Sequence, residues 1–430
     1  MNGEQNARRL RQLLLRPNAK RAGVLLSGAV VAQIVPIVAS PLLTRLYTPS
    51  TYGALATFGA ISAIVTAVAT GRYHMATTLP VADSDARAIT SLSLRLSITF
   101  CGLLTITALA WFLFLPIPQA LRPLGIWMVA IPLAGLLGSI YETLTIFSLR
   151  HDATKVIAKT SAARSVTGAG AQAILGVAGA GIHGLIGGTL ISLLTGNYPL
   201  WRKFRDQGAP TSAGALITVA RRYSAFPRFE LWSNLSNILG LNITILGIGA
   251  LYSHSSLGQY SLSYRMLTLP AALIGMTASQ VYLRELSLRR SAGGSGDRIF
   301  RSTLLYLSTL SVAPFIILWV FAPDIFQFVF GPEWREAGDF TRAMMPVIWM
   351  RFIMSPLSTT FLVYERQRAL LIWQLVILVT TLASFVAANV FTWPALRFAA
   401  FNAWALAAVY AGLLAHVYRL TQDSERSRTP

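Results

Sequence analysis

Residues 369–391 read ALLIWQLVILVTTLASFVAANVF, a run of 23 residues without a charged side chain. An α-helix rises about 1.5 Å per residue, so about 20 such residues cross the hydrocarbon core of a bilayer. A helix is also the element that satisfies all of its backbone polar groups within one segment, which hydrocarbon requires. The run therefore predicts a transmembrane helix.

Eleven further apolar runs of similar length occur in the 430 residues. Hydrophobic residues make up 54% of the chain and charged residues 12%, whereas about a quarter of a soluble domain is charged. We therefore expect an all-α integral membrane protein of twelve transmembrane helices, with no room for an appended soluble catalytic domain. The predicted spans are 23–46, 53–72, 91–115, 122–149, 164–181, 183–201, 225–250, 257–283, 302–322, 340–364, 369–391 and 398–419.

The basic residues predict the orientation of these helices. The chain has 36 Lys and Arg against 16 Asp and Glu, a formal net charge of +20. Lys and Arg near span ends resist translocation, and most of them fall in alternate connections if the N-terminus is cytoplasmic. We therefore expect both termini in the cytoplasm. Because the positive charge is dispersed over many loops, it does not indicate nucleic acid as a partner.

Two halves of the chain share a short motif. The turns at residues 46–53 and 251–258 have Leu, Tyr, Ser and Gly in common at a constant offset of 205. Six spans separate the turns, which indicates a parallel repeat, a transporter architecture with its binding site near the bilayer midplane. We expect two six-helix parallel-repeat bundles around a central lumen. The predicted segments are a basic cytoplasmic N-terminal segment 1–22, bundles 23–201 and 225–419, a cytoplasmic linker 202–224 and a cytoplasmic tail 420–430.

Sequence motifs give little support for catalysis or cofactor binding. The chain has no Gly-x-x-x-x-Gly-Lys-Ser/Thr loop, so ATP has no phosphate-binding loop. The single cysteine, Cys101, excludes an internal disulfide and a Cys-based metal cluster. The five histidines show no metal-ligand spacing. We expect no cofactor, no metal and no catalytic residue, and an ion gradient, a membrane potential or the substrate's own gradient as the energy source.

Two arginines, Arg265 and Arg351, lie inside predicted helices. A charged side chain at the centre of a span costs about 2.5 to 3.5 kcal/mol on insertion scales, so it usually faces a partner or a water-filled cavity. One interpretation is a structural ion pair with Glu142 or Glu230. The interpretation we favour is that the arginines face a lumen and bind an anion, because guanidinium binds phosphate and diphosphate oxygens bidentately.

Other polar side chains on or beside the predicted spans are further candidates. Three arginines near span ends could attract or release an anionic head group, or anchor the helices at the lipid interface. Amides could bind hydroxyl groups or hold helices together. The substrate-binding candidates are Arg265, Arg351, Arg72, Arg228, Arg45, Glu142, Gln33, Asn234 and Asn237.

Several motifs carry a resemblance to a known family. They are Thr44-Arg45-Leu46-Tyr47-Thr48-Pro49 with Tyr52-Gly53, Arg72-Tyr73 with Leu79-Pro80, Gly258-Gln259-Tyr260 with Tyr264-Arg265 and Pro270, residues 330–338 (FGPEWREAG), and Ser355-Pro356-Leu357-Ser358 before Glu365-Arg366-Gln367. In these motifs the chain resembles the polysaccharide export flippases of bacteria, the O-antigen translocase type. That family lies in the superfamily of multidrug, oligosaccharidyl-lipid and polysaccharide exporters, the MOP superfamily. Members often carry a glutamate after the Arg-Tyr pair, where this chain has His74.

The resemblance implies a function and its partners. Members move an undecaprenyl-diphosphate-linked oligosaccharide from the cytoplasmic to the periplasmic leaflet of the inner membrane, for O-antigen, capsule or exopolysaccharide biosynthesis. Rocking of one half against the other would expose the substrate site to each side in turn. The implied partners are the lipid-linked substrate, membrane lipids, a polysaccharide polymerase and a chain-length regulator. H⁺ and Na⁺ are the candidate coupling ions.

Two alternatives remain open. A gradient-driven multidrug antiporter of the same superfamily usually moves cations and would need acidic side chains in its lumen, whereas arginines predominate here. A membrane-embedded polysaccharide polymerase or ligase is expected to present an extended periplasmic loop with Arg and His. The longest predicted outside connection, residues 323–339, contains no His.

Overall fold

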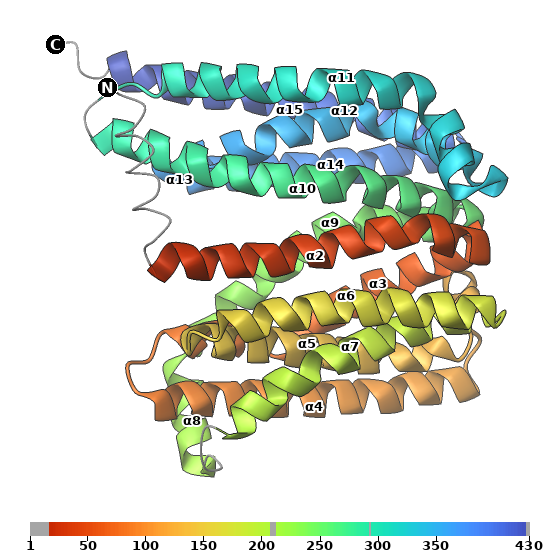
Figure 1. Ribbon diagram of the computed structural model, residues 1–430, viewed down its shortest axis with the longest axis vertical. Coiled ribbons are helices and arrows are strands. Elements are labelled where there is room, and N and C mark those ends of the chain that lie inside the picture. Colours follow the sequence, from red (N-terminus) through yellow and green to blue (C-terminus); the bar gives the residue numbers. More distant parts are fainter. Residues whose placement is uncertain (1–16, 207–211, 292–293, 427–430) are drawn as a thin grey trace. The chain divides into compact units, whose positions relative to one another are not determined.

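The computed structural model describes residues 17–206, 212–291 and 294–426 (Figure 1). Within these ranges the regular structure is helical throughout and contains no strand, which confirms the predicted all-α fold. The predicted terminal segments 1–22 and 420–430 and the linker 202–224 lie partly outside the described residues.

The chain forms two compact units. The first contains the chain up to Tyr47 and Ala54–Leu246, and the second contains Thr48–Gly53 and Gly247–Pro430. The helices from the N-terminal side are α2 (Pro17–Leu46), α3 (Pro49–Ala69), η1 (Tyr73–Thr78), α4 (Asp83–Phe114), η2 (Gln119–Leu124), α5 (Trp127–Arg150), α6 (Thr154–Val177), α7 (Gly181–Asp206), α8 (Ala213–Arg222), η3 (Phe226–Glu230) and α9 (Leu231–Leu251). They are followed by α10 (His254–Ser291), α11 (Asp297–Phe330), η4 (Pro332–Trp334), α12 (Arg335–Leu357), α13 (Thr360–Val363), α14 (Gln367–Val390) and α15 (Ala395–Arg426).

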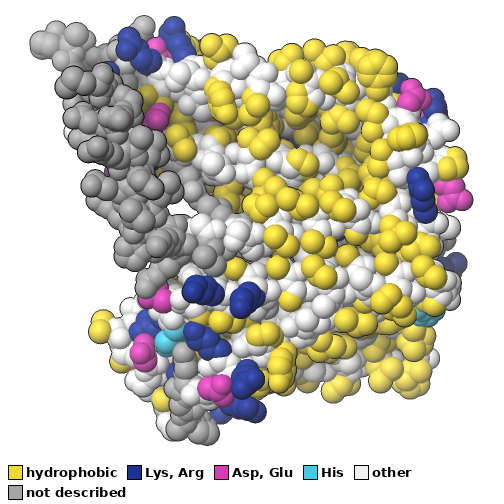
Figure 2. Space-filling view, in the orientation of Figure 1, with side chains coloured by type: hydrophobic (Ala, Val, Ile, Leu, Met, Phe, Trp, Pro, Cys, Tyr) yellow, Lys and Arg dark blue, Asp and Glu magenta, His cyan; other side chains and the backbone are white. Residues whose placement is uncertain are grey.

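Ten stretches of helix in the described residues are long and apolar enough to cross a bilayer. Helices α6 and α7 do not meet this criterion, although they cover the predicted spans 164–181 and 183–201 and are 24 and 26 residues long. Lys155, Lys159 and Arg164 lower the mean hydropathy of α6, and the glycines, threonines and other polar residues of 181–198 lower that of α7. On the face shown in Figure 2, hydrophobic side chains cover the middles of the helices and charged ones gather near the ends. The protein therefore spans a membrane many times, and the number twelve stays a prediction.

Close helix packing organises the first unit. Helix α6 packs against α2 and α7, and α5 packs against α4 and α7. Small residues permit the approach: a Cβ added to Gly28 would overlap with the backbone of Ala158. Such residues matter in a bilayer because lipid chains are as apolar as leucine, so close van der Waals packing holds the helices together. Tyr47 Oη also donates a hydrogen bond to the carbonyl oxygen of Gln172 at 2.6 Å.

Helix α12 is the centre of the second unit. It packs against α10, α11 and α15. Its side chains Phe352, Ile353, Met354 and Leu357 belong to the buried core of this unit. Arg351 on the same helix therefore lies beside residues of α10 and α15.

The repeated motif marks a reciprocal contact inside the second unit. Helix α3 begins at Pro49 and α10 begins at His254, positions related by the offset of 205. A Cβ on Gly53 would overlap with the carbonyl oxygen of His254, and a Cβ on Gly258 would overlap with that of Pro49. The two helix starts therefore cross where only glycine fits, at equivalent positions of the repeat.

Candidate functional site

Arg351 lies in the C-terminal half of α12 among tyrosines. Its Nη1 donates a hydrogen bond to Tyr264 Oη of α10 at 3.1 Å. Tyr260 of α10 and Tyr410 of α15 are its further electrostatic neighbours. The rings of Tyr260 and Tyr264 are nearly parallel, at 13°, with centroids 6.0 Å apart. The surroundings of this guanidinium are thus neutral hydroxyl groups, which orient its charge without cancelling it.

Arg265 lies on α10 directly after Tyr264 and is partly buried. Its electrostatic neighbour is Tyr52, at the start of α3. Tyr52 packs edge-on against Trp334 of η4, with ring centroids 4.9 Å apart. The second unit therefore brings together residues from three of the motifs that carry the family resemblance.

Among the described residues of their own unit, neither arginine has a carboxylate partner. The salt bridges among the described residues of the second unit join Arg301 to Asp297, Arg335 to Asp324 and Arg342 to Asp339. Of the two carboxylates considered for a structural ion pair, Glu230 bonds to Arg72 at 3.0 Å and Glu142 lies 3.8 Å from His74. The second unit thus holds two positive charges inside membrane-spanning helices with no opposing charge from its described residues.

Arg72 lies in a tight turn of the first unit. Gly71 and Arg72 both have a left-handed backbone, with φ of 56° and 62°. A positive φ is uncommon for arginine and persists where the surroundings enforce it. Here Thr70 Oγ1 accepts a hydrogen bond from the Arg72 N–H at 3.1 Å. The turn directs the guanidinium to Glu230, so its charge is largely neutralised.

His74 lies close to the same turn and is 2% exposed. Its Nδ1 is 2.7 Å from Thr70 Oγ1, and its Nε2 is 3.8 Å from Glu142 Oε2 of α5. Burial, and then the positive charge of Arg72, lower the pKa of His74 to about 4. The imidazole is therefore neutral at pH 7, and its approach to Glu142 is not an ion pair at that pH.

Arg164 is an interior arginine that sequence reasoning missed. The predicted span began at residue 164, whereas α6 begins at Thr154, so Arg164 lies well inside the helix. Its guanidinium lies 4.2 Å from the ring centroid of Tyr141, and Glu142 is its electrostatic neighbour. No residue type in the sequence signals this earlier helix start, because the left-handed backbone of Asp152, just before the helix, cannot be read from residue type alone.

The remaining candidates are scattered. Arg45 at the end of α2, Arg228 in η3 and Asn237 in α9 are exposed. Asn234 is partly buried, and Gln33 Oε1 is buried without a hydrogen-bond partner among the described residues. Among the candidates, Arg72 therefore forms a salt bridge with Glu230, and Arg351 contacts Tyr264, the residue before Arg265. The roles of all nine candidates in substrate binding remain predictions.

The comparison with protein families identifies the chain. A family model described as "Polysaccharide biosynthesis protein" matches residues 42–339, which include the motifs around Arg72 and Arg265. The chain belongs to the polysaccharide biosynthesis protein family. This confirms the family resemblance predicted from the motifs.

A curated relative gives this family member a further point of comparison. The teichuronic acid biosynthesis protein TuaB of Bacillus subtilis (strain 168) is 27% identical over 174 residues. The match covers 40% of this chain and 36% of TuaB, so it spans little more than a third of the relative's length.

Solved structures show the fold of this family member. An inward-facing multidrug resistance MATE family transporter of the MOP superfamily is 13% identical, with a TM-score of 0.68 over 94% of this chain and 100% of its own. The lipid II flippase MurJ, in an inward closed conformation, is 10% identical, with a TM-score of 0.64 over 92% of this chain and 89% of its own. At these identities the likeness establishes a shared transporter fold and nothing finer.

Proposed function

We propose that this protein is a lipid-linked oligosaccharide flippase. It moves an undecaprenyl-diphosphate-linked repeat unit from the cytoplasmic to the periplasmic leaflet of the bacterial inner membrane, for a surface polysaccharide such as O-antigen, capsule or exopolysaccharide. The observation that supports this most is the pair Arg265 and Arg351. Both lie inside membrane-spanning helices next to tyrosines, with no carboxylate partner among the described residues of their unit.

A diphosphate head group matches the charge of this pair. Each guanidinium presents parallel N–H donors that fit two phosphate oxygens, and such charge-assisted bonds are roughly twice as strong as neutral ones. Unassisted crossing would strip water from the diphosphate and sugar hydroxyls, at about 2 to 7 kcal/mol for each unpaired polar group. The hydroxyls of Tyr264 and Tyr410 supply further hydrogen-bonding groups beside the charge. A protein-lined polar path is therefore what such a substrate requires.

The wider scheme follows from the sequence predictions. Both termini lie in the cytoplasm, and alternating access to a central lumen carries the head group across while the polyprenyl chain stays in hydrocarbon. Arg72 and Arg228 serve as first contacts for the head group, and Arg45 serves at release. A polysaccharide polymerase and a chain-length regulator receive the product, and H⁺ or Na⁺ couples the cycle. The protein carries out no covalent chemistry itself.

A gradient-driven multidrug antiporter is the second candidate, and one observation favours it. The Glu142 side chain is 46% exposed although α5 spans the membrane, so it could bind a cation or a proton. Under this alternative, deletion of the gene would sensitise cells to cationic drugs and leave surface polysaccharide unchanged.

Deletion of the gene tests the flippase proposal. Lipid-linked intermediates are identified by mass spectrometry, and leaflet-selective labelling reports which face of the membrane they occupy. The flippase predicts that complete repeat units accumulate on the cytoplasmic face. Accumulation of flipped but unpolymerised units would instead indicate a polymerase or ligase and would contradict the proposal.

A further inference from the structure

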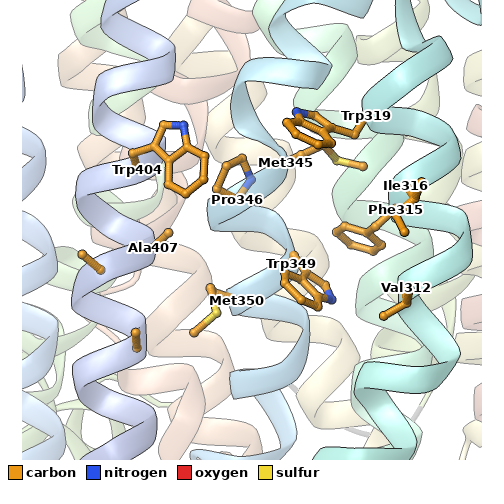
Figure 3. Close-up of a pocket in the computed structure, with 12 residues that line it drawn as sticks. Val312, Phe315, Ile316, Trp319, Met345, Pro346, Trp349, Met350, Trp404 and Ala407 are labelled. Carbon is orange, nitrogen blue, oxygen red and sulfur yellow. The ribbon is translucent and has the colours of Figure 1, made fainter.

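An apolar cavity lies in the second unit between α11, α12 and α15 (Figure 3). Its volume is ≈ 560 Å³, within the range of about 300 to 1,000 Å³ that is common for small-molecule sites. The three helices contribute four lining residues each. Its largest lining side chains are Phe315, Trp319, Met345, Trp349, Met350 and Trp404.

The apolar lining of the cavity favours a hydrocarbon ligand. All of the lining residues are apolar or aromatic, and none carries a charge. The indole N–H of Trp349 already donates a hydrogen bond to Ser311 Oγ at 2.9 Å. A cavity with so few free polar groups does not hold ordered water, because a buried water needs two to four hydrogen-bond partners. Sugars, phosphates and solvated ions are excluded for the same reason.

The cavity opens at the surface of the helices, near the middle of the predicted spans. Its lining residues lie near the centres of the spans Asp297–Phe330, Pro332–Val363 and Ala395–Gln422. Trp319 and Trp404 at its rim are 54% and 63% exposed, whereas Met345 is 4% exposed. A hydrocarbon chain can therefore enter sideways from the bilayer core.

Two lining residues are sequence neighbours of residues at the arginine site. Met350 directly precedes Arg351 on α12, and Ala411 directly follows Tyr410 on α15. A head group bound at Arg351 is thus at the same height in the membrane as the cavity. Ordinary lipids keep their head groups at the surface and reach the midplane only with their chain ends. A chain attached to a head group held at Arg351 would instead begin at this height.

We propose that this cavity binds the polyprenyl chain of the lipid-linked substrate, in the segment next to the diphosphate, while Arg351 binds the diphosphate. The inference rests on the proposed flippase function. It assigns to α11, α12 and α15 a binding surface for the carrier lipid, separate from any contact with the sugar.

Two physical effects favour this chain over bulk lipid. Lipid chains are as apolar as the wall, so burial from water provides no driving force and selectivity depends on van der Waals fit. The flexible thioethers of Met345 and Met350 adapt to an irregular, methyl-branched chain. The bound diphosphate also tethers the chain, which raises its effective concentration at the cavity.

Photo-crosslinking of the purified full chain in nanodiscs tests the proposal. The probe is a polyprenyl diphosphate with a diazirine on an isoprene unit near the diphosphate, and peptide mapping locates the label. The expected label lies on the lining residues of α11, α12 and α15. Excess unlabelled polyprenyl diphosphate should remove it, and excess phosphatidylglycerol should not.

Two variants on α15 form a matched pair. Ala408→Trp fills the cavity and should lower labelling of the lining by about tenfold, which corresponds to roughly 1.4 kcal/mol of binding. Ala415→Trp adds the same bulk to the same face two turns further on, at an exposed position outside the lining, and should leave labelling unchanged. Ala411→Trp serves as a second filling variant if Ala408→Trp reduces the protein level.

Other outcomes overturn the proposal. Labelling that phosphatidylglycerol removes equally well would make the cavity a general acyl-chain site. Label absent from the lining, or unaffected by both filling variants, would place the chain elsewhere. The flippase function itself is judged separately by polysaccharide export: loss of export in Arg265→Ala, together with a missing label, would refute the cavity and leave the function standing.

Discussion

The interior arginines of the two units have different neighbours. In the first unit Arg72 bonds to Glu230 at 3.0 Å, and Glu142 is an electrostatic neighbour of both Arg72 and Arg164. In the second unit Arg351 bonds to Tyr264 and Arg265 lies near Tyr52. An anion responds to the net charge around a site rather than to the number of arginines. We therefore predict that the second unit is the better anion site, whereas Arg72 and Arg164 of the first unit have carboxylate neighbours.

The largest expected effect comes from removing the unbalanced charges. Arg265→Ala and Arg351→Ala should each lower polysaccharide export by about a hundredfold, because a hydrogen bond to a charged group contributes about 1.5 to 3 kcal/mol. Complementation of a deletion strain measures export, with protein level followed by immunoblot. Arg397→Ala, at an exposed position at the start of α15, is the matched control and should export normally. Full export with Arg351→Ala would contradict the prediction that the unbalanced arginines of the second unit bind the head group.

The buried histidine predicts acid sensitivity of the first unit. Because the pKa of His74 falls to about 4 on folding, the unfolded chain binds the proton more tightly. Stability is therefore complete above about pH 6.5 and decreases toward pH 4, by about 2 to 3 kcal/mol. Thermal unfolding in detergent between pH 7.5 and 4.5 should show this loss, and His74→Gln should reduce it.

The exposed His183 provides the control for this titration. His183→Gln should keep the wild-type pH dependence. If His74→Gln leaves the acid-induced loss of stability unchanged, His74 is not its source.

The glycine crossing of the second unit predicts an intermediate effect. Gly258→Ala should destabilise the protein by about 1 to 3 kcal/mol. The added Cβ overlaps with the carbonyl oxygen of Pro49, and relief of that overlap requires the two helix backbones to move apart. Gly102→Ala on α4, which has open space around it, should be neutral or stabilise slightly. Thermal unfolding of the purified variants measures both. Equal stabilities would argue against the close crossing.

The smallest effect is expected at the ion pair of the first unit. The Glu230 side chain is 42% exposed, so its bond to Arg72 should contribute only about 0.5 to 1 kcal/mol to stability. Glu230→Gln should lower thermal stability by this amount and reduce export far less than Arg265→Ala does. A loss of export as large as that of Arg265→Ala would mean that both units bind the head group.

Much of the fold could be predicted from the sequence, because an apolar run that must cross hydrocarbon leaves only the helix as an option. Helix starts were less certain: α6 begins ten residues before the prediction, since hydropathy falls at its basic first turns although the helix continues. Arg265 and Arg351 could be singled out because a charge in an apolar run is rare. Their tyrosine neighbours could not, because Tyr264 and Tyr410 reach Arg351 only through the packing of α10 and α15 on α12. The pairing of Arg72 with Glu230 joins residues 158 positions apart for the same reason.

Binding of a soluble short-chain polyprenyl diphosphate, farnesyl diphosphate, to the purified protein tests the central claim most directly. Titration by microscale thermophoresis compares the wild type with the double variant Arg265→Gln/Arg351→Gln and with Arg72→Gln. The account predicts that the double variant weakens binding by about a hundredfold or more, and that Arg72→Gln changes it by about threefold or less. Wild-type affinity in the double variant, with the loss confined to Arg72→Gln, would contradict it.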